Sequence, residues 1–105
     1  MNTLLEIQEW YKEQCNGDWE HGMGVKIDNI DNPGWSVKIS IKETMLEGKS
    51  FSPVQYGVGD QAIDGDGKWL ICRLEKGEFV GYGGPFKLEE ILRVFLDWKN
   101  ACRQI

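Results

Sequence analysis

Four side chains that could do chemistry lie close together near the start of the chain. Cys15, Asp18, Glu20 and His21 supply a thiol, two carboxylates and the sole imidazole. They could hold a metal ion, form a Cys–His nucleophilic pair or act as paired carboxylates. A zinc site needs three or four regularly spaced ligands, and a nucleophile needs an oriented base and an oxyanion donor. The sequence shows neither, so we interpret the group first as solvated or structurally hydrogen-bonded side chains.

Other motifs for ligands or catalysis are incomplete. Asp60, Asp64 and Asp66 resemble part of a calcium loop, but a third regularly spaced oxygen ligand and the closing glutamate are missing, so we expect a turn. The sequence has no phosphate-binding loop, dinucleotide fingerprint or G-x-S-x-G elbow. Three widely spaced cysteines predict free thiols. We therefore expect no cofactor and no metal.

Two tryptophan side chains in the same region are expected to be buried from water. Trp19 and Trp35 lie in a stretch rich in aspartate and glycine, and an exposed indole forfeits about 1.5–3 kcal/mol of available burial. Either the core of this protein or a partner must therefore cover these two side chains.

The first third of the chain predicts a helix followed by a hairpin. A capping box of Thr3 and Glu6 starts a helix over about residues 3–15. Alternating apolar residues then predict strands over 23–28 and 35–42, joined by a turn at 31–34. The helix presents an apolar face made of Leu4, Ile7, Trp10, Tyr11 and Cys15.

The second half predicts another hairpin and a final helix. The sequence predicts a strand over residues 51–58, and it predicts a tight turn at Lys76-Gly77 between strands over 68–75 and 78–82. In that register the pairs across the hairpin are Leu74 with Phe79, Cys72 with Gly81, and Leu70 with Gly83. Pro85 precedes a helix whose apolar side chains are Leu88, Ile91, Leu92, Phe95, Trp98 and Cys102.

Glycines on one face of the second hairpin leave room for this helix to approach the sheet. On the solvent-exposed face of this helix, Arg93 can form ion pairs with Glu89 and Asp97. The other sheet face is too apolar to be left in water, so the first helix or a partner must cover part of it. Its side chains are Trp69, Ile71, Val80 and Tyr82. We expect one α+β domain over residues 1–105, with a four- to five-stranded, mainly antiparallel sheet and a helix at each end.

Charge and hydropathy narrow the function classes. A formal net charge of −5 and a pI near 4.8, with no basic cluster, disfavour nucleic-acid binding and favour a basic partner. No basic leader and no run of about 18 apolar residues is present, which predicts a cytoplasmic protein without a membrane segment.

The motifs GDWEH at 17–21 and DNPGW at 31–35 resemble the immunity protein 53 family of bacterial polymorphic toxin systems. The similarity covers nearly the whole chain, although Asn16 replaces an expected aspartate and Asn29 an expected threonine. Other residues that carry it are Trp10, Tyr11, Cys15, Gly24, Ile27, Trp69 and Trp98.

This resemblance implies a non-enzymatic cytoplasmic antidote that binds a cognate toxin domain. Aromatic anchors would supply affinity, and carboxylates would attract a basic toxin such as a nuclease. The candidate partner-binding residues are Asp18, Trp19, Glu20, His21, Asp31, Asn32 and Trp35. Core positions for Trp19 and Trp35 are the alternative.

Two other hypotheses stay open at this point. One is a small enzyme or metal-dependent ligand-binding domain that uses Cys15, Asp18, Glu20 and His21. The other is a structural or regulatory interaction module unrelated to toxins.

Overall fold

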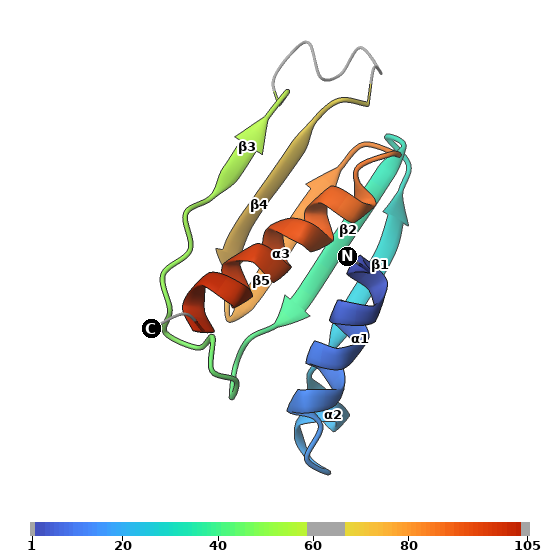
Figure 1. Cartoon of the computed structure of the whole chain (residues 1–105). Coiled ribbons are helices and arrows are strands. Elements are labelled where there is room, and N and C mark those ends of the chain that lie inside the picture. Colours follow the sequence, from blue (N-terminus) through green and yellow to red (C-terminus); the bar gives the residue numbers. More distant parts are fainter. Residues whose placement is uncertain (1, 59–66, 104–105) are drawn as a thin grey trace.

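A computed structural model describes residues 2–58 and 67–103, which form a sheet layer and a helix layer (Figure 1). The five strands are all antiparallel to their neighbours, in the order β1-β2-β5-β4-β3. They are β1 (Val25–Ile30), β2 (Gly34–Ser40), β3 (Val54–Tyr56), β4 (Leu70–Glu75) and β5 (Glu78–Gly83). The helices are α1 (Thr3–Gln14), the single turn α2 (Trp19–Gly22) and α3 (Leu88–Arg103). The α+β fold is confirmed, whereas the acidic loop with Asp60, Asp64 and Asp66 lies outside the described residues.

Helix α1 begins at Thr3, as predicted, but the residue that caps it is Asn2. The side-chain oxygen of Asn2 accepts from the N–H of Leu5 at 3.0 Å, which satisfies one free donor of the first turn. The prediction that Thr3 caps the helix is therefore wrong by one residue. Thr3 is instead buried at the first helical position.

Only part of the predicted apolar face of α1 is buried. Ile7 and Trp10 are 6% and 1% exposed, whereas Leu4 and Tyr11 are 60% and 38% exposed. The prediction of one broad core-facing stripe is wrong for these last two side chains. The sheet and α3 cover a narrower stripe than the sequence pattern offers.

The hairpin of β4 and β5 has the predicted register, with Leu74 opposite Phe79 and Cys72 opposite Gly81. The predicted hairpin of β1 and β2 is also present. Pairing of β2 with β5 joins the two hairpins, placing Val37 beside Gly81. The sheet is therefore built from two local hairpins joined by one long-range pairing, and β3 adds to it by pairing with β4.

Helix α3 lies close against β5 because glycines face it. A Cβ atom added to Gly81 would lie 2.4 Å from Cγ2 of Ile91. From α3, Phe95 then makes edge contacts with Trp10 and Phe79, with ring centroids 5.0 and 5.3 Å apart. The core therefore runs from β5 through α3 to α1.

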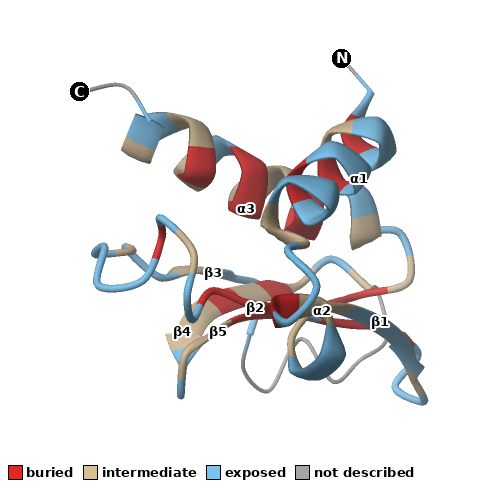
Figure 2. Ribbon diagram, turned by 90° about the horizontal axis from the view of Figure 1, so that it is seen from below, coloured by how far each residue is buried: buried red, intermediate tan, exposed pale blue. Residues whose placement is uncertain are grey.

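Both long helices cover the same face of the sheet (Figure 2). The hypothesis that the first helix covers the other face is therefore wrong, and neither α1 nor α3 lies there. On that face Val80 is 2% exposed, and Trp69, Ile71 and Tyr82 are half-buried. None of the described helices is long and apolar enough to cross a membrane.

The ion pairs of α3 differ in part from the prediction. Arg93 pairs with Asp97 at 3.0 Å as expected, but its other partner is Glu6 of α1, at 2.7 Å, and not Glu89. Glu89 is exposed. The bond to Glu6 joins the two helices across 87 positions in sequence.

Substitution of Gly81 by alanine tests the close approach of α3. The added Cβ has no room beside Ile91, so we expect Gly81→Ala to lower the free energy of unfolding by about 1–3 kcal/mol in urea denaturation. Gly22→Ala is the matched control, because no atom lies within 4 Å of a Cβ at that position. Equal stability of the two variants would contradict the packing described here.

Candidate partner-binding site

The GDWEH motif folds into a compact turn held by the side chains of Glu20 and of Asn16, the residue before the motif. The side-chain oxygen of Asn16 accepts from the N–H groups of Asp18 and Trp19, at 2.9 and 2.8 Å. The carboxylate of Glu20 accepts from the N–H groups of Asn16 and Gly17, at 2.9 and 2.8 Å. Asn16 and Glu20 thus satisfy main-chain N–H groups at the start of α2 and just before it.

These bonds favour the charged form of Glu20. Its pKa is lowered chiefly by a hydrogen bond from its own N–H. Burial is the next-largest effect and opposes this shift, but the hydrogen bonds from Asn16 and Gly17 and the nearby His21 add to the lowering, and the net pKa is below the ordinary value. The folded turn therefore prefers the carboxylate to the acid.

Trp19 is a core residue at one end of the sheet. Its side chain is 2% exposed, and its indole N–H donates to the carbonyl of Lys42 at 2.9 Å. The ring meets Trp10 edge-on, with centroids 5.9 Å apart. Trp19 thereby fixes α2 and the chain after β2 against α1.

The side chains first considered for chemistry are either hydrogen-bonded to the main chain or exposed to solvent. The thiol of Cys15 donates to the carbonyl of Tyr11 at 3.3 Å, Glu20 binds main-chain N–H groups, and His21 is exposed. Among the described residues, no three His, Cys, Asp or Glu side chains are grouped to hold a metal ion. Elsewhere, burial raises the pKa of the Cys72 thiol to about 12, with a smaller effect from the carboxylate of Glu90. That thiol is poorly suited to nucleophilic chemistry.

The DNPGW motif forms the turn between β1 and β2, where Asp31 and Asn32 are exposed. Gly34 has no room for a side chain, since an added Cβ would lie 2.2 Å from the carbonyl oxygen of Gly83. Trp35 is half-buried, and its indole N–H donates to the carbonyl of Pro85 at 3.0 Å. This bond ties the base of the hairpin to the loop before α3.

The two motifs lie at opposite ends of β2 (Figure 1). Trp19 binds Lys42 just beyond the end of the strand, whereas Trp35 is its second residue. The extended part of this segment, from Trp35 to the end of β2 at Ser40, alone corresponds to about 17 Å. The candidate residues therefore do not form one site: Asp18, Trp19, Glu20 and His21 lie at one end, and Asp31, Asn32 and Trp35 at the other.

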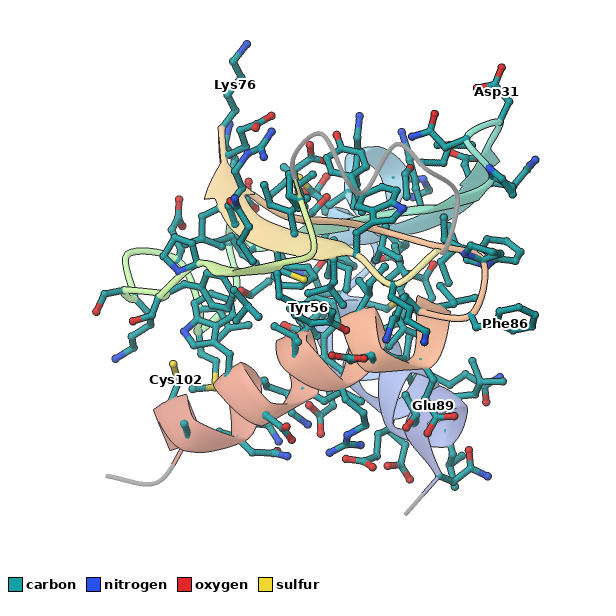
Figure 3. All side chains as sticks on the ribbon, turned by 90° about the horizontal axis from the view of Figure 1, so that it is seen from above. Asp31, Tyr56, Lys76, Phe86, Glu89 and Cys102 are labelled. Atoms are coloured by element: carbon teal, nitrogen blue, oxygen red, sulfur yellow. The ribbon has the colours of Figure 1, made fainter. Side chains whose placement is uncertain are left out.

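The hairpin end carries further exposed groups that the sequence interpretation missed. Phe86 is 94% exposed in the loop between β5 and α3. Figure 3 shows Phe86, Asp31 and Glu89 on the same side of the molecule, although they come from three separate segments. The only sequence signal is an aromatic residue between Pro85 and Lys87, just before the final helix. We call Asp31, Asn32, Phe86 and Glu89 the hairpin-end surface.

A cavity of about 520 Å³ lies between the first turns of α1 and α3. The hydroxyl of Thr3 is buried there and has no hydrogen-bond partner among the described residues. The cavity is mostly apolar with a few polar groups, which is typical of a socket for one side chain of a partner. It is lined by Asn2, Thr3, Leu4, Leu88, Glu89 and Leu92.

Comparison with known proteins identifies the family. Residues 4–100 match the family model of immunity protein 53. The chain belongs to the immunity protein 53 family. The match includes both tryptophan motifs and most of α3, and it confirms the resemblance inferred from the motifs. No curated protein and no solved structure gives a significant match to this immunity protein.

The Glu20 carboxylate should stabilise this immunity protein only where it is ionised. Because the folded-state pKa is lowered, its contribution is present above the ordinary value of 4.5 and is lost as the pH falls through the folded value. We expect Glu20→Gln to lower the thermal midpoint at pH 7 and the difference from wild type to vanish in acid. Glu9→Gln, on the exposed side of α1, controls for loss of charge. A difference that persists unchanged in acid would contradict this account.

Truncation of Trp19 should be far more costly than truncation of its neighbour in α2. Trp19→Ala removes a buried ring and its hydrogen bond, so we expect a loss of about 3–5 kcal/mol in urea denaturation. His21→Ala removes an exposed side chain and should change stability by no more than about 0.5 kcal/mol. Similar losses in the two variants would argue against a core role for Trp19.

Proposed function

We propose that this protein binds a cognate toxin domain of a bacterial polymorphic toxin system in the cytoplasm and blocks it without catalysis. Membership in a family of immunity proteins carries the proposal. Cys15 and Glu20 are hydrogen-bonded to main-chain groups and His21 is exposed, and these roles also favour binding over turnover.

We assign the main contact to the hairpin-end surface. Phe86 is almost fully exposed, and aromatic side chains that become buried on binding dominate the affinity of protein interfaces. Near it in sequence, Leu88 and Glu89 line the mostly apolar cavity between α1 and α3, which offers a socket for one side chain of the toxin. A complementary toxin surface would have a pocket for Phe86 and a protruding side chain that enters the cavity.

Charge at this end favours a basic toxin. Asp31 and Glu89 are exposed, and neither carboxylate has an ion-pair partner among the described residues. With a net charge of −5, the whole chain would attract a cationic domain and speed its association. A nuclease fits this description, because a site that binds phosphate is basic.

The remaining candidate residues then have different roles. Trp35 positions the hairpin through its bond to Pro85, while Trp19 and Glu20 hold the turn around α2. Asp18 and His21 face solvent at the other end. They are exposed polar groups far from the hairpin-end surface, so substitutions there can serve as controls.

Binding to the toxin domain encoded beside this gene tests the proposal. By isothermal titration calorimetry, we expect Phe86→Ala to raise the dissociation constant about 30-fold or more, as loss of a central aromatic anchor does. Asp31→Lys should chiefly slow association and weaken its salt dependence. Co-expression should rescue cells from the toxin with wild type and fail with Phe86→Ala.

The matched control is the double variant Asp18→Lys and His21→Ala at the far end, which should bind as wild type does. Loss of binding in this control, with Phe86→Ala unaffected, would move the interface to the α2 end. Failure of the wild-type protein to bind or neutralise the neighbouring toxin would overturn the proposed function itself.

A further inference from the structure

The outer edge of β1 carries main-chain groups that no described strand pairs with, because β1 is the first strand of the sheet. The N–H of Ser40 donates to the carbonyl of Gly24 at 2.9 Å. Hydrogen bonding alternates from residue to residue along an antiparallel ladder. From this starting point, Val25, Ile27 and Asn29 must turn their N–H and C=O groups away from β2.

We propose that β1 pairs with β1 of a second copy of this chain, antiparallel and centred on Ile27. In this register Ile27 faces its own equivalent, and Val25 faces Asn29 of the second copy. Each of these pairs can exchange both of its outward main-chain hydrogen bonds. The interface has twofold symmetry, and it converts two exposed edges into the centre of one continuous sheet.

The charges of β1 complement themselves in this register. Lys26 and Asp28 flank Ile27, so each lies opposite the other in the second copy, where Cα atoms are about 4.5 Å apart and side chains are close. Both are exposed, and neither has an ion-pair partner among the described residues. Centring the pairing on Val25 or Asn29 would leave both charges without an opposite charge.

The neighbouring strand gives a second electrostatic reason. Within one copy, Lys26 lies opposite Lys38 of β2, and like charges in this position are destabilising. Asp28 of the second copy would lie on the other side of Lys26. The proposed pairing thus offsets a repulsion that the isolated sheet retains.

Apolar surface along the same edge would also be covered. Ile27 is 39% exposed on the helix-covered face. A groove of about 350 Å³ runs between α1 and β1, lined in part by Tyr11, Met23 and Val25. A twofold axis perpendicular to the sheet keeps the helices of both copies on one face, so the second copy buries Ile27 and adjoins this groove.

Charge reversal and its compensation test the register. By sedimentation velocity of the full chain, from micromolar to millimolar concentration, we expect a reversible dimer. Asp28→Lys or Lys26→Asp alone should raise its dissociation constant about tenfold or more, since each change creates two like-charge pairs. The double variant Lys26→Asp and Asp28→Lys should restore dimerisation. Lys76→Glu, at the turn between β4 and β5, is the control and should change nothing.

Cross-linking gives an independent measurement. Paired Cα atoms at this type of position are about 5.5 Å apart, within the range that a disulfide spans. Ile27→Cys should therefore form a disulfide-linked dimer on oxidation, visible on a non-reducing gel. Asn29→Cys should not, because its equivalent lies several residues away, and wild type controls for the native thiols.

Three results would overturn the proposal. The first is a wild-type protein that stays monomeric at millimolar concentration. The second is a dimer that neither charge reversal weakens. The third is a one-to-one complex with the toxin in which the toxin alone protects the main chain of β1 from hydrogen exchange. The first two measurements use no toxin, so they are independent of the proposed function.

Discussion

The close approach of α3 to β5 is the contact on which the rest of the fold depends. Because Gly81 has no side chain, Ile91 rests directly on the strand, and α3 comes near enough for Phe95 to fill the space above the sheet. Phe95 in turn supports Trp10 of α1, and Trp10 supports Trp19 of α2. A wider gap between α3 and the sheet would remove the support of both α1 and α2.

Two indole N–H groups connect the packed core to segments near the surface. Trp19 and Trp35 each donate to a main-chain carbonyl far away in the sequence, at Lys42 and Pro85. A buried indole that keeps its hydrogen bond is a rigid connection, because it loses few rotatable bonds on folding. The exposed groups near each end of β2 are therefore held in place by tryptophans that do not themselves need to touch a partner.

The sequence predicted elements that depend on local rules. Lys76-Gly77 fixed the register of the second hairpin, and the spacing of apolar residues identified α3, because both signals act over a few residues. It could not place the two hairpins side by side, since no local rule brings Val37 to Gly81. It also missed the exposed Phe86 and the cavity beside Thr3, because single side chains in loops and at helix starts have no periodic pattern.

The long-range pairing of β2 with β5 also bears on how quickly the chain can fold. Each hairpin closes through a short turn, which takes microseconds in isolated hairpins. Joining them brings Ser40 to Glu78, and closing a loop of that length costs about 3 kcal/mol of chain entropy before the central contacts form. We therefore expect the pairing of β2 with β5 to form more slowly than either hairpin. Topology thus sets the refolding rate more than the strength of any single contact does.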